Sequence, residues 1–182
     1  MKELSLHVYD LMENSIAAKA TLVELTIRDS LKDNIFHFTI RDNGKGMSPE
    51  FLARVTDPYT TSRTTRKVGL GLPLIKMNTT NCGGDMELTS QLGVGTTLKF
   101  WFQHNHWDRP PMGDLVGTLV MLVSQHEEIH FVITYTTDEG EFVFDTDEIK
   151  EALDGMSMKE MAIQKYLKEF VAENLAEIHA NE

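Results

Sequence analysis

Two polar side chains near the start of the chain could act on a phosphate-bearing ligand. Asp10 and Asn14 lie in a run, Glu3 to about Ala20, whose apolar residues recur at helical spacing. Residues four apart project from one helix face as neighbours. The Asp10 carboxylate, a candidate general base, would then lie beside the Asn14 amide oxygen, a ligand type that Mg²⁺ accepts. For this pair alone, a solvated polar face is the simpler interpretation.

A further acidic residue, Asp42, ends a strand-like run. Every second residue between Asn34 and Arg41 is apolar, and Asp42 shares their parity, so its carboxylate is directed toward the buried side. A carboxylate there is costly unless a donor meets it. Gly44 and Gly46 follow, and they let a flat ligand approach the backbone closely. The arrangement suits an exocyclic amine such as that of adenine, although Asp-Asn-Gly is also ordinary turn chemistry.

Two later patterns could bind anions. Residues 57–68 combine many hydroxyl groups with three cations, which indicates either a loop over an anion or a merely solvated loop. Gly69-Leu70-Gly71-Leu72 then opens a helix, where free backbone N–H groups can hold phosphates. Thr96 has the same strand parity as three apolar residues after it, so its hydroxyl is expected on the buried side, as a core threonine or a second contact to a base.

These candidates require a mixed set of helices and strands to position them. We expect strands over residues 22–29, 34–42, 85–91 and 96–103, a short helix that begins after Ser48, and a longer one that ends near Cys82. Residues 105–111 read as a linker. Beyond it we expect a helix over 113–125, a hairpin of 129–137 with 141–145, and two helices opened by capping boxes at Asp145 and Ser157. The apolar stripe of the last helix either packs on this C-terminal unit, which is the default, or docks a partner or a second copy of the chain.

Composition narrows the class of protein. The 182 residues carry a net charge of −11, which disfavours broad binding to nucleic acid or to an anionic membrane. The single cysteine, Cys82, cannot form an internal disulfide. We see neither an apolar run long enough to span a bilayer nor a signal peptide, and therefore expect a cytoplasmic protein.

Taken in order, four motifs resemble the GHKL ATPase superfamily, the nucleotide domain of sensor histidine kinases, DNA gyrase, heat-shock chaperones and mismatch-repair ATPases. The motifs are Asp10-x-x-x-Asn14, DNGKGM, GLGLPL and GVGTTLKF, and the resemblance covers roughly residues 4–103. It implies an α/β (α+β) fold, a two-layer α/β sandwich that binds ATP with Mg²⁺. We expect this domain over residues 1–104, with a small C-terminal α+β appendage over 112–182.

The same resemblance implies a role for each matched residue. Asn14 is implied as the Mg²⁺ ligand, Asp42 as the acceptor for the adenine amine, and Thr96 as a residue near the base. The remaining implied contacts to the nucleotide come from the two glycine motifs: Gly44, Gly46, Met47, Gly69, Leu70, Gly71 and Leu72. Asp10 stands where the hydrolysing branches carry a glutamate, and because aspartate is one methylene shorter we expect any hydrolysis to be slow.

The chain begins at the Asp10 helix, so we expect a stand-alone module without a phosphoacceptor or transducer domain. Three functions stay open: slow ATP hydrolysis or nucleotide-switched regulation of an unidentified protein partner, phosphorylation of a separate partner on histidine or serine, and ATP binding without turnover. A homodimer is compatible with each of the three.

Overall fold

The computed structural model of the chain describes residues 3–57 and 71–180. Among these residues, a six-stranded sheet has the strand order β3-β4-β2-β1-β5-β6. The strands are β1 (Leu22–Ser30), β2 (Ile35–Asp42), β3 (Asp85–Gln91), β4 (Gly95–Gln103), β5 (His130–Thr137) and β6 (Glu141–Asp145). The helices are α1 (Leu4–Ala17), α2 (Pro49–Val55), α3 (Gly71–Asn81), α4 (Leu115–Gln125), α5 (Thr146–Leu153) and α6 (Met161–Glu177).

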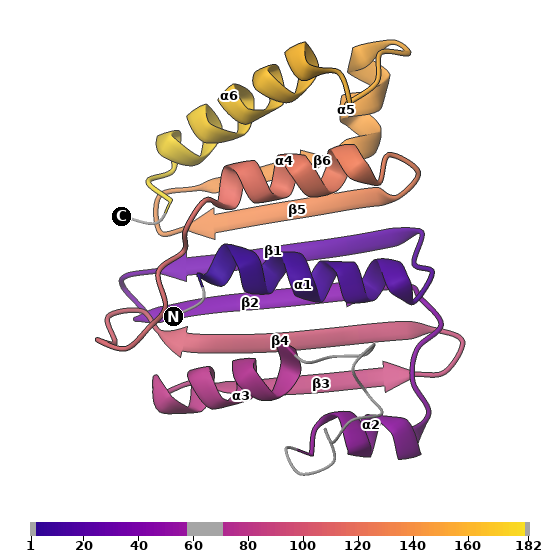
Figure 1. Cartoon of the computed structure of the whole chain (residues 1–182). Helices are drawn as coiled ribbons and strands as arrows, with labels where there is room; N and C mark the ends of the chain where they lie inside the picture. The colour runs from indigo at the N-terminus through magenta and orange to yellow at the C-terminus, as the bar shows by residue number, and fades with distance from the viewer. Residues whose placement is uncertain (1–2, 58–70, 181–182) are drawn as a thin grey trace.

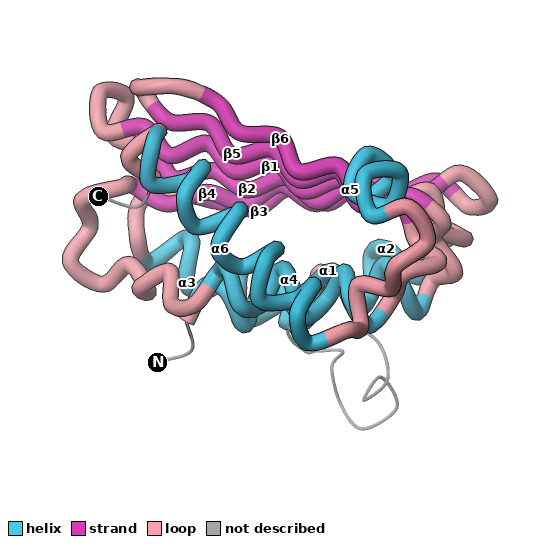
Figure 2. Tube along the Cα trace, turned by 90° about the horizontal axis from the view of Figure 1, so that it is seen from above, coloured by secondary structure: helices cyan, strands magenta, loops and turns pink. Residues whose placement is uncertain are grey.

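The molecule has two layers (Figures 1 and 2). Helices α1, α3, α4 and α6 lie on one side of the sheet, whose other side carries no helix in the described residues. The predicted two-layer α+β fold is therefore confirmed. None of the helices in residues 3–57 and 71–180 is long and apolar enough to cross a membrane.

The core lies between the two layers because the strands alternate in polarity. Phe36 and Phe38 of β2 and Phe100 and Phe102 of β4 are fully buried on the helical side. The rings of Phe38 and Phe100 stack with centroids 4.8 Å apart. The predicted parity of β2 and β4 is thus correct, and it carries the last residue of β2, Asp42, and its pairing partner on β4, Thr96, toward that same side.

The C-terminal segment continues the sheet of the first hundred residues. Strand β5 pairs in parallel with β1, in a register that runs from Leu22 opposite His130 to Asp29 opposite Thr137. Strand β6 then pairs antiparallel with β5, and α6 packs on α4. The segment predicted to be an appendage therefore contributes two strands to a shared sheet.

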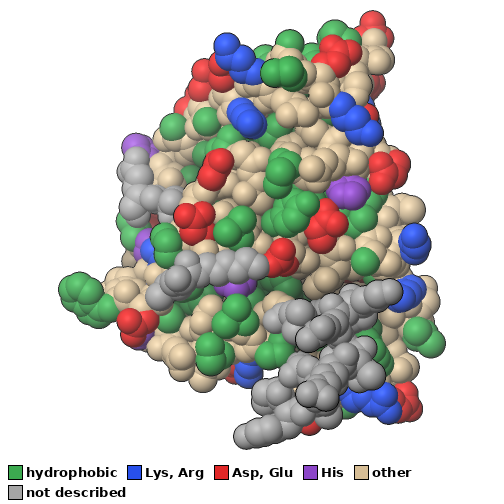
Figure 3. Space-filling model, in the orientation of Figure 1, with side chains coloured by type: hydrophobic (Ala, Val, Ile, Leu, Met, Phe, Trp, Pro, Cys, Tyr) green, Lys and Arg blue, Asp and Glu red, His purple; other side chains and the backbone are tan. Residues whose placement is uncertain are grey.

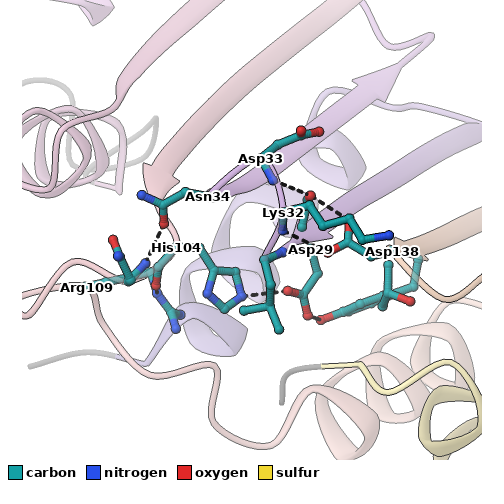
Figure 4. A network of polar contacts seen from close by, with 12 residues as sticks. Asp29, Lys32, Asp33, Asn34, His104, Arg109 and Asp138 are labelled. Atoms are coloured by element: carbon teal, nitrogen blue, oxygen red, sulfur yellow. Dashed lines mark hydrogen bonds and ion pairs between the residues drawn. The ribbon is translucent and has the colours of Figure 1, made fainter.

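A buried polar network holds the C-terminal strands against the first part of the sheet (Figure 4). Asp29 of β1 accepts hydrogen bonds from His104 Nε2 and from the Tyr135 hydroxyl of β5, each over 2.7 Å. Arg109 Nε donates to the His104 carbonyl over 2.7 Å, and its guanidinium lies 4.9 Å from the ring centroid of Phe36. Because the Asp29 carboxylate bonds to two other segments, the network fixes β1, β5 and the segment after β4 relative to one another.

One predicted helix start is wrong. The capping box at Ser157 does not open α6, which begins at Met161 with Glu160 as N-cap. Ser157 instead donates to the Glu127 carboxylate over 2.9 and 3.0 Å. The box at Asp145 does open α5, and the Asp145 side chain accepts from the Asp147 amide.

Candidate nucleotide-binding site

Asp42 lies at the end of β2, where it faces α1. Ser15 Oγ donates to Asp42 Oδ2 over 2.7 Å, and the Gly44 amide donates to Oδ1 over 2.9 Å. Two groups of the protein itself, the Ser15 hydroxyl and the Gly44 amide, thus already donate to this half-buried carboxylate. Each carboxylate oxygen has two lone pairs, so Asp42 keeps capacity to accept further hydrogen bonds.

The glycines after Asp42 shape the backbone beside it. A Cβ at Gly44 would lie 2.8 Å from the Ala18 carbonyl oxygen and 3.0 Å from Asp42 Oδ1. At Gly46 the φ angle is +68°, and a Cβ would lie 2.0 Å from the Gln91 carbonyl oxygen. Gly44 therefore requires glycine because a side chain would collide with Ala18, and Gly46 requires it for its conformation as well as for its contact with Gln91.

Thr96 and Met47 are joined through one serine. Ser90 Oγ lies 2.8 Å from Thr96 Oγ1 and donates to the Gly95 carbonyl over 3.0 Å. It also accepts from the Met47 amide over 2.8 Å. The side chain of Ser90 therefore ties the glycine turn after β2 to the β3–β4 pair, and it holds the Thr96 hydroxyl beside Asp42.

A pocket of about 610 Å³ opens between α1, α2 and the ends of the strands. This volume suits a small-molecule ligand, as does a lining that is mostly apolar with a few polar groups. Its polar lining in the described residues comprises Asn14, Ser15, Asp42, Lys45, Ser48 and Thr96. The apolar lining includes Leu11, Ile40, Met47, Phe51, Leu72 and Leu98.

The residues predicted to form the site are distributed as follows. Asn14, Asp42, Gly46, Met47, Leu72 and Thr96 all line the pocket. Gly44 lies against the Asp42 carboxylate and Ala18, and Gly71 is the first residue of α3. Asp10, one turn before Asn14 on α1, is not among the lining residues in the described ranges. Gly69, Leu70 and most of the predicted anion-binding loop, residues 58–68, fall outside the described residues.

Three participants were not predicted from the sequence. Lys45, which stands between two glycines of the motif, lines the pocket. Ser15 is buried on α1, and its hydroxyl donates to Asp42. Ser90 carried no signal at all, because its role depends on a strand pairing that brings Met47 to it.

Charge is divided unevenly along the chain. Residues 112–182 contain 16 Asp and Glu against 4 Lys and Arg, whereas residues 1–111 contain 12 against 13. On the helical face, acidic side chains are spread among basic and apolar ones (Figure 3). The half that forms the pocket is thus close to neutral, and the large negative net charge does not oppose an anionic ligand there.

Comparison with known proteins agrees with this geometry. The model of the histidine kinase-, DNA gyrase B-, and HSP90-like ATPase family matches residues 2–106, more than half of the chain. The chain belongs to this family. The predicted GHKL resemblance is thereby confirmed, and the pocket lies wholly inside the matched region.

Individual relatives of the histidine kinase-like ATPase family match a fraction of the chain. The histidine protein kinase DivJ of Caulobacter vibrioides is 32% identical over 95 residues, which are 50% of this chain and 16% of DivJ. The chain thus spans about one sixth of the length of this curated relative.

Two solved structures share the fold. The crystal structure of the N-terminal domain of a DNA repair protein has a TM-score of 0.55 at 19% identity, over 79% of this chain and 52% of that chain. The Aquifex aeolicus MutL ATPase domain complexed with ADP has a TM-score of 0.51 at 16% identity, over 85% and 70%.

Proposed function

We propose that this chain binds ATP with Mg²⁺ in the pocket and that its nucleotide state regulates a protein partner, with slow hydrolysis resetting the state. The observation that carries the proposal is the Asp42 carboxylate in the pocket wall, held by Ser15 and Gly44 with acceptor capacity to spare. Membership of an ATPase family supports the choice of nucleotide.

The pocket residues fit the two groups that the family implies. Asp42 would accept from the exocyclic amine of adenine, and Gly44 and Gly46 keep the adjoining backbone free of side chains. Asn14 offers an amide oxygen from α1, an oxygen ligand of the kind that Mg²⁺ prefers. Bound Mg²⁺ would neutralise charge on the phosphates. Lys45 supplies a cation in the same lining.

Binding is better supported than turnover. Asn14 lines the pocket, whereas Asp10 does not in the described residues, and an aspartate reaches less far than a glutamate. A base that acts from this position would hold a water at the edge of the site, which is consistent with slow hydrolysis. Regulation of a partner by the bound nucleotide does not require Asp10 to act as a base.

The decisive experiment is calorimetric titration of ATP with Mg²⁺ into wild type and Asp42→Asn. The variant loses the negative charge and has an NH2 donor in place of one acceptor oxygen, so binding should weaken by about tenfold or more, because hydrogen bonds to a charged group contribute about 1.5–3 kcal/mol. Asp33→Asn is the matched control, since it makes the same chemical change in the β1–β2 turn, away from the pocket. Equal affinities in wild type and Asp42→Asn would remove the adenine assignment.

A second function, phosphoryl transfer to a separate partner, is favoured by one observation. The matched relative DivJ is a histidine protein kinase. Incubation with labelled ATP and cell extract distinguishes the two: label on a partner protein would favour the kinase, and release of free phosphate alone would favour the ATPase. Intact bound ATP after long incubation would identify a scaffold that binds without turnover.

A further inference from the structure

Helix α1 is held by the C-terminal segment on the face beside its pocket residues. Tyr9 OH donates to Gln125 Oε1 over 3.4 Å, and Glu13 Oε1 accepts from His126 Nε2 over 2.9 Å. Tyr9 and Glu13 are one turn apart on α1 and directly precede Asp10 and Asn14. Two consecutive residues at the end of α4 therefore contact two consecutive turns of the helix that carries the nucleotide-site residues.

The contact of Glu13 with His126 is well defined. A carboxylate only accepts, so Nε2 of His126 carries the proton that it shares with Glu13. On the other side of the ring, Nδ1 lies 3.6 Å from Glu128 Oε1. Burial, followed by the charge of Glu13, raises the pKa of Tyr9, which places Glu13 close to Tyr9 as well.

The next residue continues the connection away from α1. The Ser157 hydroxyl donates one bifurcated hydrogen bond to the two oxygens of the Glu127 carboxylate, over 2.9 and 3.0 Å, and the Met158 amide donates another to the same carboxylate. Met158 is 1% exposed, whereas Met156 and Met161 on either side are 52% and 87% exposed. Residues 125–127, the bridge, thus link α1 to the segment between α5 and α6 by side-chain hydrogen bonds at both ends.

We propose that the bridge transmits the nucleotide state of the pocket to the segment 154–161. The inference rests on the proposed function, and it specifies the regulation of that site. A ligand bound at Asn14 orders α1, and ordering of α1 restrains Glu13, His126 and through Glu127 the backbone at Ser157 and Met158. The segment is suited to respond, because one buried methionine and the Glu127 carboxylate anchor it between two exposed methionines.

The test is hydrogen exchange of residues 154–161 with and without saturating ATP and Mg²⁺. In wild type we expect nucleotide to slow exchange there by about two- to thirtyfold. Glu13→Ala, which keeps helix propensity in α1 and leaves the Tyr9–Gln125 hydrogen bond in place, should clearly reduce this difference at saturation while residues that line the pocket are still protected. Glu128→Ala is the matched control, because it removes the other carboxylate near His126 without touching α1, and it should keep the difference.

The other outcomes separate failure of this inference from failure of the proposed function. A full nucleotide effect in Glu13→Ala would overturn the proposal, as would ATP binding in wild type without any effect at 154–161. In both cases the proposed function would stand. Absence of ATP binding in wild type would instead refute the proposed function, and this inference with it.

Discussion

Gly46 and Gly93 show how the surroundings of a single residue decide what a substitution costs. Both have positive φ, +68° and +77°, but a Cβ at Gly93 meets nothing within 4 Å, whereas one at Gly46 would lie 2.0 Å from a backbone oxygen. Gly93→Ala should therefore destabilise the protein by about 1 kcal/mol from conformational strain alone. Gly46→Ala should cost clearly more. Denaturant unfolding measures both, and equal losses would contradict the argument.

Asp10 offers a prediction about turnover. Because it does not line the described pocket, Asp10→Asn should bind ATP with unchanged affinity. If Asp10 is the base, the variant should lose any hydrolysis, measured as phosphate release under saturating ATP. Persistent release at the wild-type rate would exclude Asp10 from that role.

For single residues, the sequence predicted where the acidic residues and glycines of the site lie better than it predicted which residues they contact. The alternation of β2 directs Asp42 inward, and the same parity in β4 directs Thr96 to that side, whereas their position opposite each other comes from the pairing of β2 with β4. Ser15 and Ser90 are different, because a serine hydroxyl gains its role from whichever strand or helix the fold brings to it. That information is not local, and neither side chain is distinctive in sequence.

Among the elements, α6 depends on a narrow buried stripe. Leu167 is fully buried, and the neighbouring Lys168 is exposed. Leu167→Ala should lower the free energy of unfolding by about 2–5 kcal/mol, because it leaves a cavity under the helix. Lys168→Ala, one position along the same helix, should change it by less than about 0.5 kcal/mol. Similar effects of the two in chemical unfolding would show that α6 does not pack as described.

The β5–β6 turn is fastened to the β1–β2 turn by one carboxylate whose titration can be followed. Asp138 accepts from the Ser30 hydroxyl and from the amides of Leu31 and Lys32. The Ser30 hydrogen bond, and next that of Lys32, lowers the pKa of Asp138 below its ordinary value. A lowered folded-state pKa gives stability that is present above the unfolded pKa and is lost as the pH falls below about 4.

Stability of wild type and Asp138→Asn at pH 7 and pH 3 tests this dependence. We expect the difference between the two proteins to be larger at pH 7 than at pH 3. A difference that does not change with pH would show that Asp138 contributes no such stabilisation.

The start of α6 is a helix boundary that the sequence did not predict correctly. Ser157 and Glu160 have the spacing of a capping box, but the Ser157 hydroxyl is engaged by Glu127, thirty positions earlier in the chain. The Ser157 hydroxyl also accepts from the Lys159 amide over 3.1 Å, so its local bond lies in the turn before α6 and not at the first turn of the helix. The strands and the caps at Ser48 and Asp145 rest on local signals, and these were predicted correctly.

For the whole molecule, the shared sheet predicts that the two halves unfold together. Tyr135→Phe removes one of the hydroxyl and imidazole donors that meet the buried Asp29. It should cost about 1.5–3 kcal/mol. The loss should be equal when hydrogen exchange is followed in β3–β4 and in β5–β6. Two separate unfolding steps would instead support independent domains at 1–104 and 112–182.

The joining of the halves was beyond sequence reasoning for a physical reason. Local patterns predict that β5 is a strand, but they do not say which strand it pairs with. The parallel pairing with β1 goes with the burial of Val23, Leu25 and Ile27 in the core between the sheet and the helices. Such a requirement is a property of the assembled layers.

The central place of β1 has a consequence for biosynthesis. Its first partner, β2, is the next strand to leave the ribosome, but its second partner begins at His130. Until then the nascent chain presents an open hydrogen-bonding edge on β1, a template for pairing with other chains. Slow translation before residue 130 should therefore favour aggregation, and a chaperone that covers this edge should relieve it.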